Sequence, residues 1–121
     1  MRKYENLTHL HENTHPPRSH YIPYDTLEGA LSGDRERSAY FTLLNGEWDF
    51  KYYSRDIDCP ENITDWDTVT VPSCWQNTGY ENPNYINLRY PFPYDPPFVP
   101  DKNPCAVYER DFDLEETVGK A

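Results

Sequence analysis

Prolines dominate the stretch from Pro72 to Pro104, and they restrict the possible folds of this chain more than any other sequence feature. Six further prolines lie between them: Pro83, Pro91, Pro93, Pro96, Pro97 and Pro100. Proline lacks a backbone N–H and fixes φ, so it is excluded from helix interiors and central strands. The same stretch carries large rings that are costly to leave in water, namely Trp75, Tyr80, Tyr85, Tyr90, Phe92, Tyr94 and Phe98. We therefore expect a long, ordered loop whose aromatic side chains pack against a folded domain.

Alternating side chains predict short strands on both sides of this loop. Over residues 47–52, Trp48, Phe50 and Tyr52 share one face, and charged side chains occupy the other. The preceding Asn45-Gly46 favours a tight hairpin turn, with residues 41–43 as the incoming strand. Similar alternation predicts strands over residues 68–71 and 106–114. Strands that are joined by turns, with almost no helix, indicate an all-β antiparallel sandwich.

The N-terminal quarter of the chain lacks this periodicity. Pro16-Pro17 and the polar residues around them predict an extended arm over residues 1–24. After the arm, residues 25–32 favour one or two helical turns, capped by Asp25 or Thr26 and ended by Gly33. The domain itself would span residues 25–121. The domain has about four predicted strands, whereas two packed sheets need about seven or eight. We therefore expect a sandwich that is incomplete at its C-terminus.

The charge of the chain narrows its possible partners. Its formal net charge is −10, from 21 acidic and 11 basic residues. Nucleic acids and anionic membranes are bound by clustered cations, so neither is an expected partner. Cys59, Cys74 and Cys105 are widely spaced and odd in number, and no apolar run follows Met1. These features favour a cytoplasmic protein with reduced thiols.

Four histidines and two pairs of carboxylates are the candidate metal-binding and catalytic groups of this sequence. The spacing of the four histidines does not fit one helix face or a compact metal site, so we interpret them as solvated arm residues: His9, His11, His15 and His20. Neither Glu115-Glu116 nor Asp95 with Asp101 shows the features of an acid/base pair. The sequence therefore predicts no catalytic and no metal-binding residue in this chain.

Several ordered motifs resemble one enzyme family. Residues 44–50 (LNGEWDF) resemble the N-terminal signature of glycoside hydrolase family 2, and residues 71–76 (VPSCWQ) with Gly79-Tyr80 resemble its next block. Residues 83–92 (PNYINLRYPF) are similar to the LacZ-type β-galactosidases within that family, as are residues 96–100 and Asn103-Pro104. Shorter similarities lie at 22–24 and 33–38, so the resemblance runs from about residue 5 to about residue 113.

This resemblance implies a sugar-binding jelly-roll domain, of the galactose-binding-like type, at the N-terminus of a longer enzyme. Such enzymes hydrolyse terminal β-D-galactose residues of β-galactosides such as lactose, with retention of configuration. Their two catalytic glutamates lie in a later barrel domain, and their Mg²⁺ and Na⁺ ligands also lie outside the region that this chain matches. The resemblance further implies that the arm supports subunit association in a homo-oligomer and that the domain packs against the remaining domains.

One functional position carries over from the family. The asparagine of its Tyr-x-Asn block contacts the sugar and matches Asn87, with Leu88 as an adjacent apolar contact. An amide offers two donors and an acceptor to vicinal hydroxyls. A turn-capping amide is the alternative for Asn87, and stacking on sugar is the alternative to packing for the loop rings. We assign Trp48 and Trp75 to packing.

The sequence is compatible with three functional interpretations. The first is a portion of a β-galactosidase that contributes a sugar contact and is inactive alone. The second is a free-standing carbohydrate-binding module, which would bind galactose as an isolated chain. The third is a subunit-interface element that restores a deletion variant of the parent enzyme by complementation.

Overall fold

The computed structural model describes residues 2–88 and 90–113. Two compact units emerge, one formed by Met1–His15 with Gly46–Arg110 and the other by Pro16–Asn45 with Asp111–Ala121. The predicted boundary between arm and domain after residue 24 stays a prediction. The elements in chain order are the 3₁₀ helices η1 (Lys3–Glu5) and η2 (Leu7–His9), α1 (Leu27–Ser32), η3 (Arg35–Arg37), β1 (Gly46–Tyr53), η4 (Asp56–Asp58), β2 (Asp67–Val71), η5 (Trp75–Thr78) and β3 (Cys105–Glu109).

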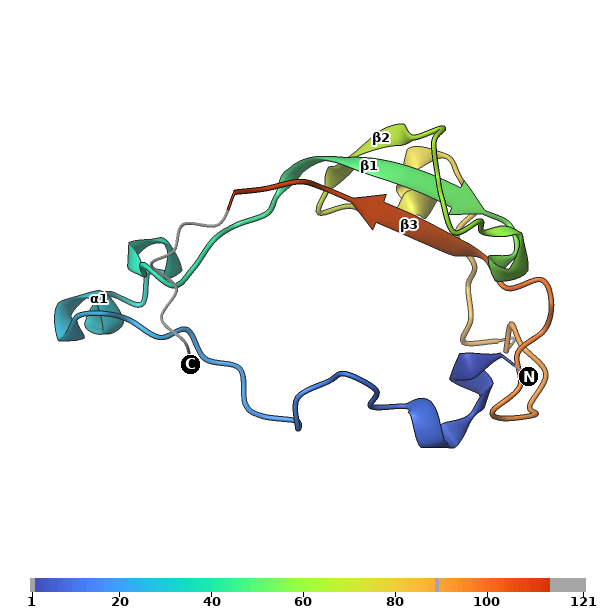
Figure 1. Cartoon of the computed structure of the whole chain (residues 1–121), viewed down its shortest axis with the longest axis horizontal. Coiled ribbons are helices and arrows are strands. Elements are labelled where there is room, and N and C mark those ends of the chain that lie inside the picture. The colour runs from blue at the N-terminus through green and yellow to red at the C-terminus, as the bar shows by residue number, and fades with distance from the viewer. Residues whose placement is uncertain (1, 89, 114–121) are drawn as a thin grey trace. The chain divides into compact units, whose positions relative to one another are not determined.

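The first unit is built on an antiparallel sheet of three strands in the order β2-β1-β3 (Figure 1). β1 pairs with β2 from Gly46 opposite Val71, and with β3 from Tyr53 opposite Cys105. The predicted strands at 47–52 and 68–71 are therefore confirmed, as is the low helix content. Among the described residues this is one sheet, and the second sheet of a jelly-roll sandwich remains a proposal.

Aromatic side chains form the core of this unit on one face of the sheet. Phe50 is fully buried (0% exposed), and its ring centroid lies 4.7 Å from that of Tyr80 and 4.8 Å from that of Tyr108. Next to it, Tyr52 lies 6.0 Å from both Trp75 and Tyr80, measured between ring centroids. Tilted and edge-on ring pairs at these distances are favourable beyond their buried area. Contacts between aromatic rings thus hold the proline-rich loop against β1.

The predicted hairpin at Asn45-Gly46 is wrong. Residues 41–45 form no strand, and β1 begins at Gly46 itself, whose φ is +129°. Both edges of β1 are taken, by β2 and by β3, so an incoming strand at 41–43 would have no edge to pair with. The preference of Asn-Gly for tight turns was overridden by these more distant pairings.

The last strand is shorter than predicted. β3 covers Cys105–Glu109, and residues 110–113 lie outside any strand, while Leu114 falls outside the described residues. The register already places Asp49 opposite Glu109. Two residues further it would place Glu47 opposite Asp111, and like charges directly opposite each other destabilise a strand pair. This repulsion is a physical reason for the strand to end where it does.

The second unit contains the predicted helical turns. α1 is preceded by Thr26, whose side chain accepts a hydrogen bond from the N–H of Gly29, and it ends at Gly33 with φ +67°. Within the same unit, the Ser38 hydroxyl donates to the Pro23 carbonyl oxygen at 2.6 Å. Threonine capping and a left-handed glycine at the end are the signals from which this helix was predicted.

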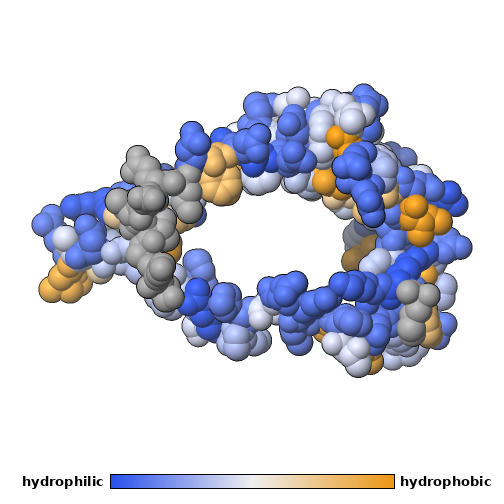
Figure 2. All heavy atoms as spheres, viewed as in Figure 1, coloured by the Kyte–Doolittle hydropathy of each residue, from blue (hydrophilic) through white to orange (hydrophobic). Residues whose placement is uncertain are grey.

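Polar groups dominate the surface. Hydrophilic residues cover most of the face that Figure 2 shows, in keeping with the acidic composition. In the described ranges, no helix has both the length and the apolar character needed to cross a membrane.

Candidate functional site

The proline-rich loop turns back onto the sheet before it forms a pocket. Gly79 directly follows η5 with φ at +91°, and the N–H groups of Gly79 and Tyr80 both donate to the Trp75 carbonyl oxygen. A left-handed glycine satisfies carbonyls at a helix end without strain. This turn directs Tyr80 onto Phe50 and leaves Trp75 at the start of the pocket wall.

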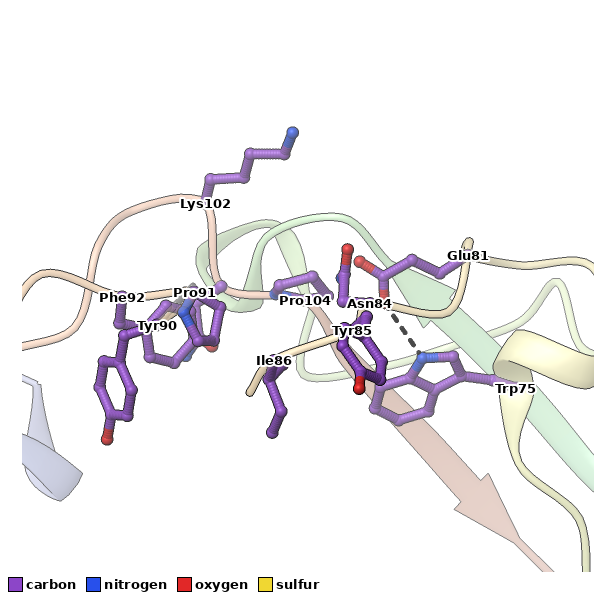
Figure 3. A pocket seen from close by; sticks show the side chains of 11 residues that line it. Trp75, Glu81, Asn84, Tyr85, Ile86, Tyr90, Pro91, Phe92, Lys102 and Pro104 are labelled. Atoms are coloured by element: carbon purple, nitrogen blue, oxygen red, sulfur yellow. Dashed lines mark hydrogen bonds between the residues drawn. The ribbon is translucent and has the colours of Figure 1, made fainter. Parts of the chain in front are cut away.

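A pocket of about 670 Å³ lies between this turn and the later part of the loop. Rings, prolines, amides and two charged side chains line it (Figure 3): Trp75, Glu81, Asn84, Tyr85, Ile86, Tyr90, Pro91, Phe92, Lys102, Asn103 and Pro104. Small-molecule sites are typically concave and mainly apolar, with a few polar groups that fix orientation. The mixture is suited to sugars, whose C–H faces pack on rings and whose hydroxyls bind amides and carboxylates.

Trp75 and Glu81 are joined to each other within the pocket wall. The indole N–H of Trp75 donates to Glu81 Oε2 at 3.2 Å, as the dashed line in Figure 3 shows. Tyr52 packs against the indole. Burial raises the pKa of Tyr52, and the negative charge of Glu81 raises it further. The indole is therefore fixed through its N–H and through its ring contact.

The opposite wall is held by the N-terminal segment. Arg2 donates to Asp101 Oδ1 at 2.5 Å and to the carbonyl oxygens of Val99 and Pro100 at 3.4 and 3.5 Å. Glu5, buried at 8% exposed, accepts from the N–H groups of Arg2 and Val99 at 2.9 and 3.4 Å. These contacts hold residues 99–101, which directly precede the pocket residues Lys102 and Asn103. We call this set of contacts the Arg2 clasp.

The two predicted site residues lie beside the pocket and do not line it. Asn87 follows Ile86, and its Nδ2 donates to the Tyr85 hydroxyl at 2.8 Å. Leu88 is 84% exposed. The structure thus brings Asn87 to a pocket residue at an exposed position. A sugar contact by Asn87 and Leu88 stays a prediction.

The rings of the loop behave in two different ways. Tyr80 packs on Phe50 as expected, but Tyr85 and Tyr94 are 76% and 91% exposed. The expectation that all the rings anchor the loop to the sheet is wrong for the exposed ones: Tyr85, Tyr90, Tyr94 and Phe98. The prolines around these rings exclude this stretch from strand pairing, so its rings are not held on the face of the sheet.

Some pocket residues were missed or misjudged from the sequence. Trp75 does pack on Tyr52 as predicted, yet it also lines the pocket, and Glu81 and Asn84 were not singled out at all. The available signal was Glu81 six residues after a tryptophan whose indole N–H needs an acceptor. Among residues 2–88 and 90–113, no group of three or more His, Cys, Asp or Glu side chains could hold a metal ion.

Comparison with known proteins supplies the evolutionary context of this site. The family described as "Glycosyl hydrolases family 2, sugar binding domain" matches residues 41–120. A β-galactosidase of Actinobacillus pleuropneumoniae is 49% identical over 108 residues, covering 87% of this chain and 11% of the relative. A β-galactosidase of Staphylococcus xylosus is 40% identical over 117 residues, covering 93% and 12% respectively. One from Oenococcus oeni is 40% identical over 103 residues, covering 80% and 10%. The chain spans about a tenth of the length of these curated relatives.

Proposed function

Because this chain belongs to the sugar-binding domain family of the family 2 glycosyl hydrolases, we propose that it is the sugar-binding part of a β-galactosidase. In this proposal the complete enzyme hydrolyses terminal β-D-galactose residues, and this chain contributes a sugar contact and packing surface. The three strands would form part of a jelly-roll sandwich. The catalytic carboxylates would come from outside this chain, which alone would be inactive.

The observation that carries the proposal is the position of Asn87. Its amide stands at an exposed point of a proline-stiffened loop, next to a pocket of rings and amides, and its Nδ2 donates to Tyr85. An amide has two N–H groups and a carbonyl oxygen, so the bond to Tyr85 leaves capacity for a sugar hydroxyl. A preordered loop also lowers the entropy lost on binding. Leu88 would add an apolar contact from its exposed position.

The remaining parts of the proposal concern the complete enzyme. The remaining domains, a homo-oligomeric assembly and a cytoplasmic location would complete the functional unit, and residues 1–24 would support association of its subunits. Mg²⁺ and Na⁺ would be held by residues outside this chain. The sugar contact proposed for Asn87 does not involve a metal ion.

A chimeric enzyme tests this function. This chain would replace the matching region of the A. pleuropneumoniae β-galactosidase, and hydrolysis of a chromogenic β-galactoside would be measured. We expect the chimera to be active and the isolated chain to be inactive. Loss of one hydrogen bond in Asn87→Ala should lower kcat/KM about tenfold.

Asn82→Ala is the matched control, because Asn82 is an exposed amide of the same loop that does not line the pocket. Its kcat/KM should equal that of the unmodified chimera. Hydrolysis by the isolated chain would contradict the proposal that the catalytic carboxylates lie outside it. Equal activity of the Asn87→Ala and Asn82→Ala chimeras would contradict the assigned sugar contact.

A further inference from the structure

Cys105 stands at the edge of the sheet where β3 begins. It lies directly opposite Tyr53, the last residue of β1. Directly opposed residues of antiparallel strands project from the same face. Tyr53 and Tyr52 project from opposite faces because strand side chains alternate. Cys105 therefore lies on the face away from the aromatic core contacts of Tyr52.

The turn that follows β1 brings a second thiol to this place. Cys59 directly follows η4, and its N–H donates to the Asp56 carbonyl oxygen at 3.1 Å. The N–H of Asp56 in turn donates to the carbonyl oxygen of Asn103 at 2.9 Å. This backbone bond fastens the turn at residues 56–59 beside the residues that lead into β3.

These backbone bonds place Cys59 near Cys105. In agreement, burial raises the pKa of the Cys105 thiol, and the neighbouring Cys59 thiol raises it further. Tyr53 pairs with Cys105 across the strands, and its pKa is raised first by burial and then also by Cys59 and Cys105. Both cysteines are half-buried, so a small oxidant has access to them.

We propose that Cys59 and Cys105 form an intrachain disulfide when the chain is exposed to hydrogen peroxide. The two S–H bonds and the O–O bond of the peroxide break, and one S–S bond forms. The sulfur atoms together lose two electrons and two protons, and the peroxide is reduced to two water molecules. Thiol reductants reverse the step by exchange.

Cys74 provides an internal comparison. It is exposed, but it directly precedes Trp75, which packs on Tyr52 and thus belongs to the opposite face of the sheet. Exposure alone would favour oxidation of Cys74, whereas the geometry favours the pair Cys59 and Cys105.

The pair also matters for the pocket, because Lys102, Asn103 and Pro104 line it and lead directly into Cys105. The disulfide would fix this wall to the turn at 56–59.

Peptide mapping of the purified chain tests the proposal. After peroxide treatment and alkylation of remaining thiols, tryptic cleavage yields residues 56–89, with Cys59 and Cys74, and residues 103–110, with Cys105. We expect a linked peptide pair that is lighter by two hydrogen atoms than its reduced parts. The link should be abolished by dithiothreitol, absent in Cys59→Ser and retained in Cys74→Ser.

Two further measurements keep the test decisive. Far-ultraviolet circular dichroism of both variants before oxidation distinguishes loss of the link from loss of the fold. Repeating the oxidation in concentrated urea should abolish the selectivity for Cys59 over Cys74, because the folded turn creates it. Absence of the linked pair in the folded chain, or its loss in Cys74→Ser with the fold intact, would overturn the proposal.

Discussion

The indole of Trp75 and the carboxylate of Glu81 are joined by a hydrogen bond of 3.2 Å, and both side chains line the same pocket. The bond closes a short stretch of chain around Gly79, so the pocket wall and the turn that seats Tyr80 on Phe50 form one structural unit. A substitution of Glu81 should therefore affect both the pocket wall and the packing of Tyr80 on Phe50.

Replacing Glu81 tests this connection. Glu81→Ala removes the acceptor of the indole N–H and should lower the free energy of unfolding by about 1 kcal/mol. Glu81→Gln keeps a carbonyl acceptor and should lose less. Urea unfolding followed by tryptophan fluorescence measures both, with the exposed Glu61→Ala as the control. Equal unfolding midpoints for Glu81→Ala and Glu61→Ala would show that the bond contributes nothing to stability.

Phe50 should be the most sensitive position of the sheet. Its ring is fully buried between Tyr80 and Tyr108, so Phe50→Ala leaves a cavity and should lower the free energy of unfolding by about 3–5 kcal/mol. Tyr94→Ala removes a comparable ring that is 91% exposed and should change it by less than about 0.5 kcal/mol. Chemical unfolding monitored by circular dichroism compares them, and similar losses in both variants would disprove the proposed core.

Glu5 should make stability depend on pH. The N–H of Arg2 lowers the pKa of Glu5 most, and the N–H of Val99 lowers it further, against the opposing effect of burial. A lowered folded-state pKa stabilises the fold above the ordinary glutamate value of about 4.3, and this stabilisation is lost as the pH falls through the folded value. The stability difference between the wild type and Glu5→Gln should thus be largest near neutral pH and shrink in acid. Urea titrations across this range measure it, with the exposed Glu36→Gln as a control; a difference that grows in acid would reverse the assigned sign.

The Arg2 clasp should control the mobility of one pocket wall. Arg2→Met removes the hydrogen bonds to Val99, Pro100 and Asp101 while it keeps much of the side-chain volume. Amide hydrogen exchange at residues 99–103, measured by mass spectrometry, should then become faster. Arg18→Met, which removes an arginine that stacks over Tyr21, should leave these amides unchanged. Unaltered exchange in Arg2→Met would show that the loop holds its position without the clasp.

Local patterns in the sequence were sufficient for part of this fold. Strict alternation predicted β1 and β2, and Thr26 with Gly33 predicted α1, because in each case neighbouring residues determine the backbone. The hairpin at Asn45-Gly46 failed because its outcome depended on competition for the edges of β1. Such competition involves residues far along the chain and leaves no local pattern.

The candidate site was predictable to a smaller degree. The family resemblance pointed to Asn87, and the structure brings this residue to Tyr85 at the pocket. Arg2, which lies almost the whole chain away, donates to residues 99–101, which directly precede the pocket residues Lys102 and Asn103. Sequence spacing carries no information on such a contact. The same holds for Cys59 and Cys105, which are widely separated in sequence and are brought near each other by the backbone bond between Asp56 and Asn103.

The strand order β2-β1-β3 also has a consequence for how the chain folds. β1 and β2 are joined by residues 54–66, whereas the partner of β1 on its other edge follows only after the entire proline-rich loop. Closing a longer loop loses more conformational entropy before any contact compensates for it. We therefore expect β1 and β2 to associate early and β3 to dock late. The pocket, which is lined by residues of that loop, would be among the last features to assemble.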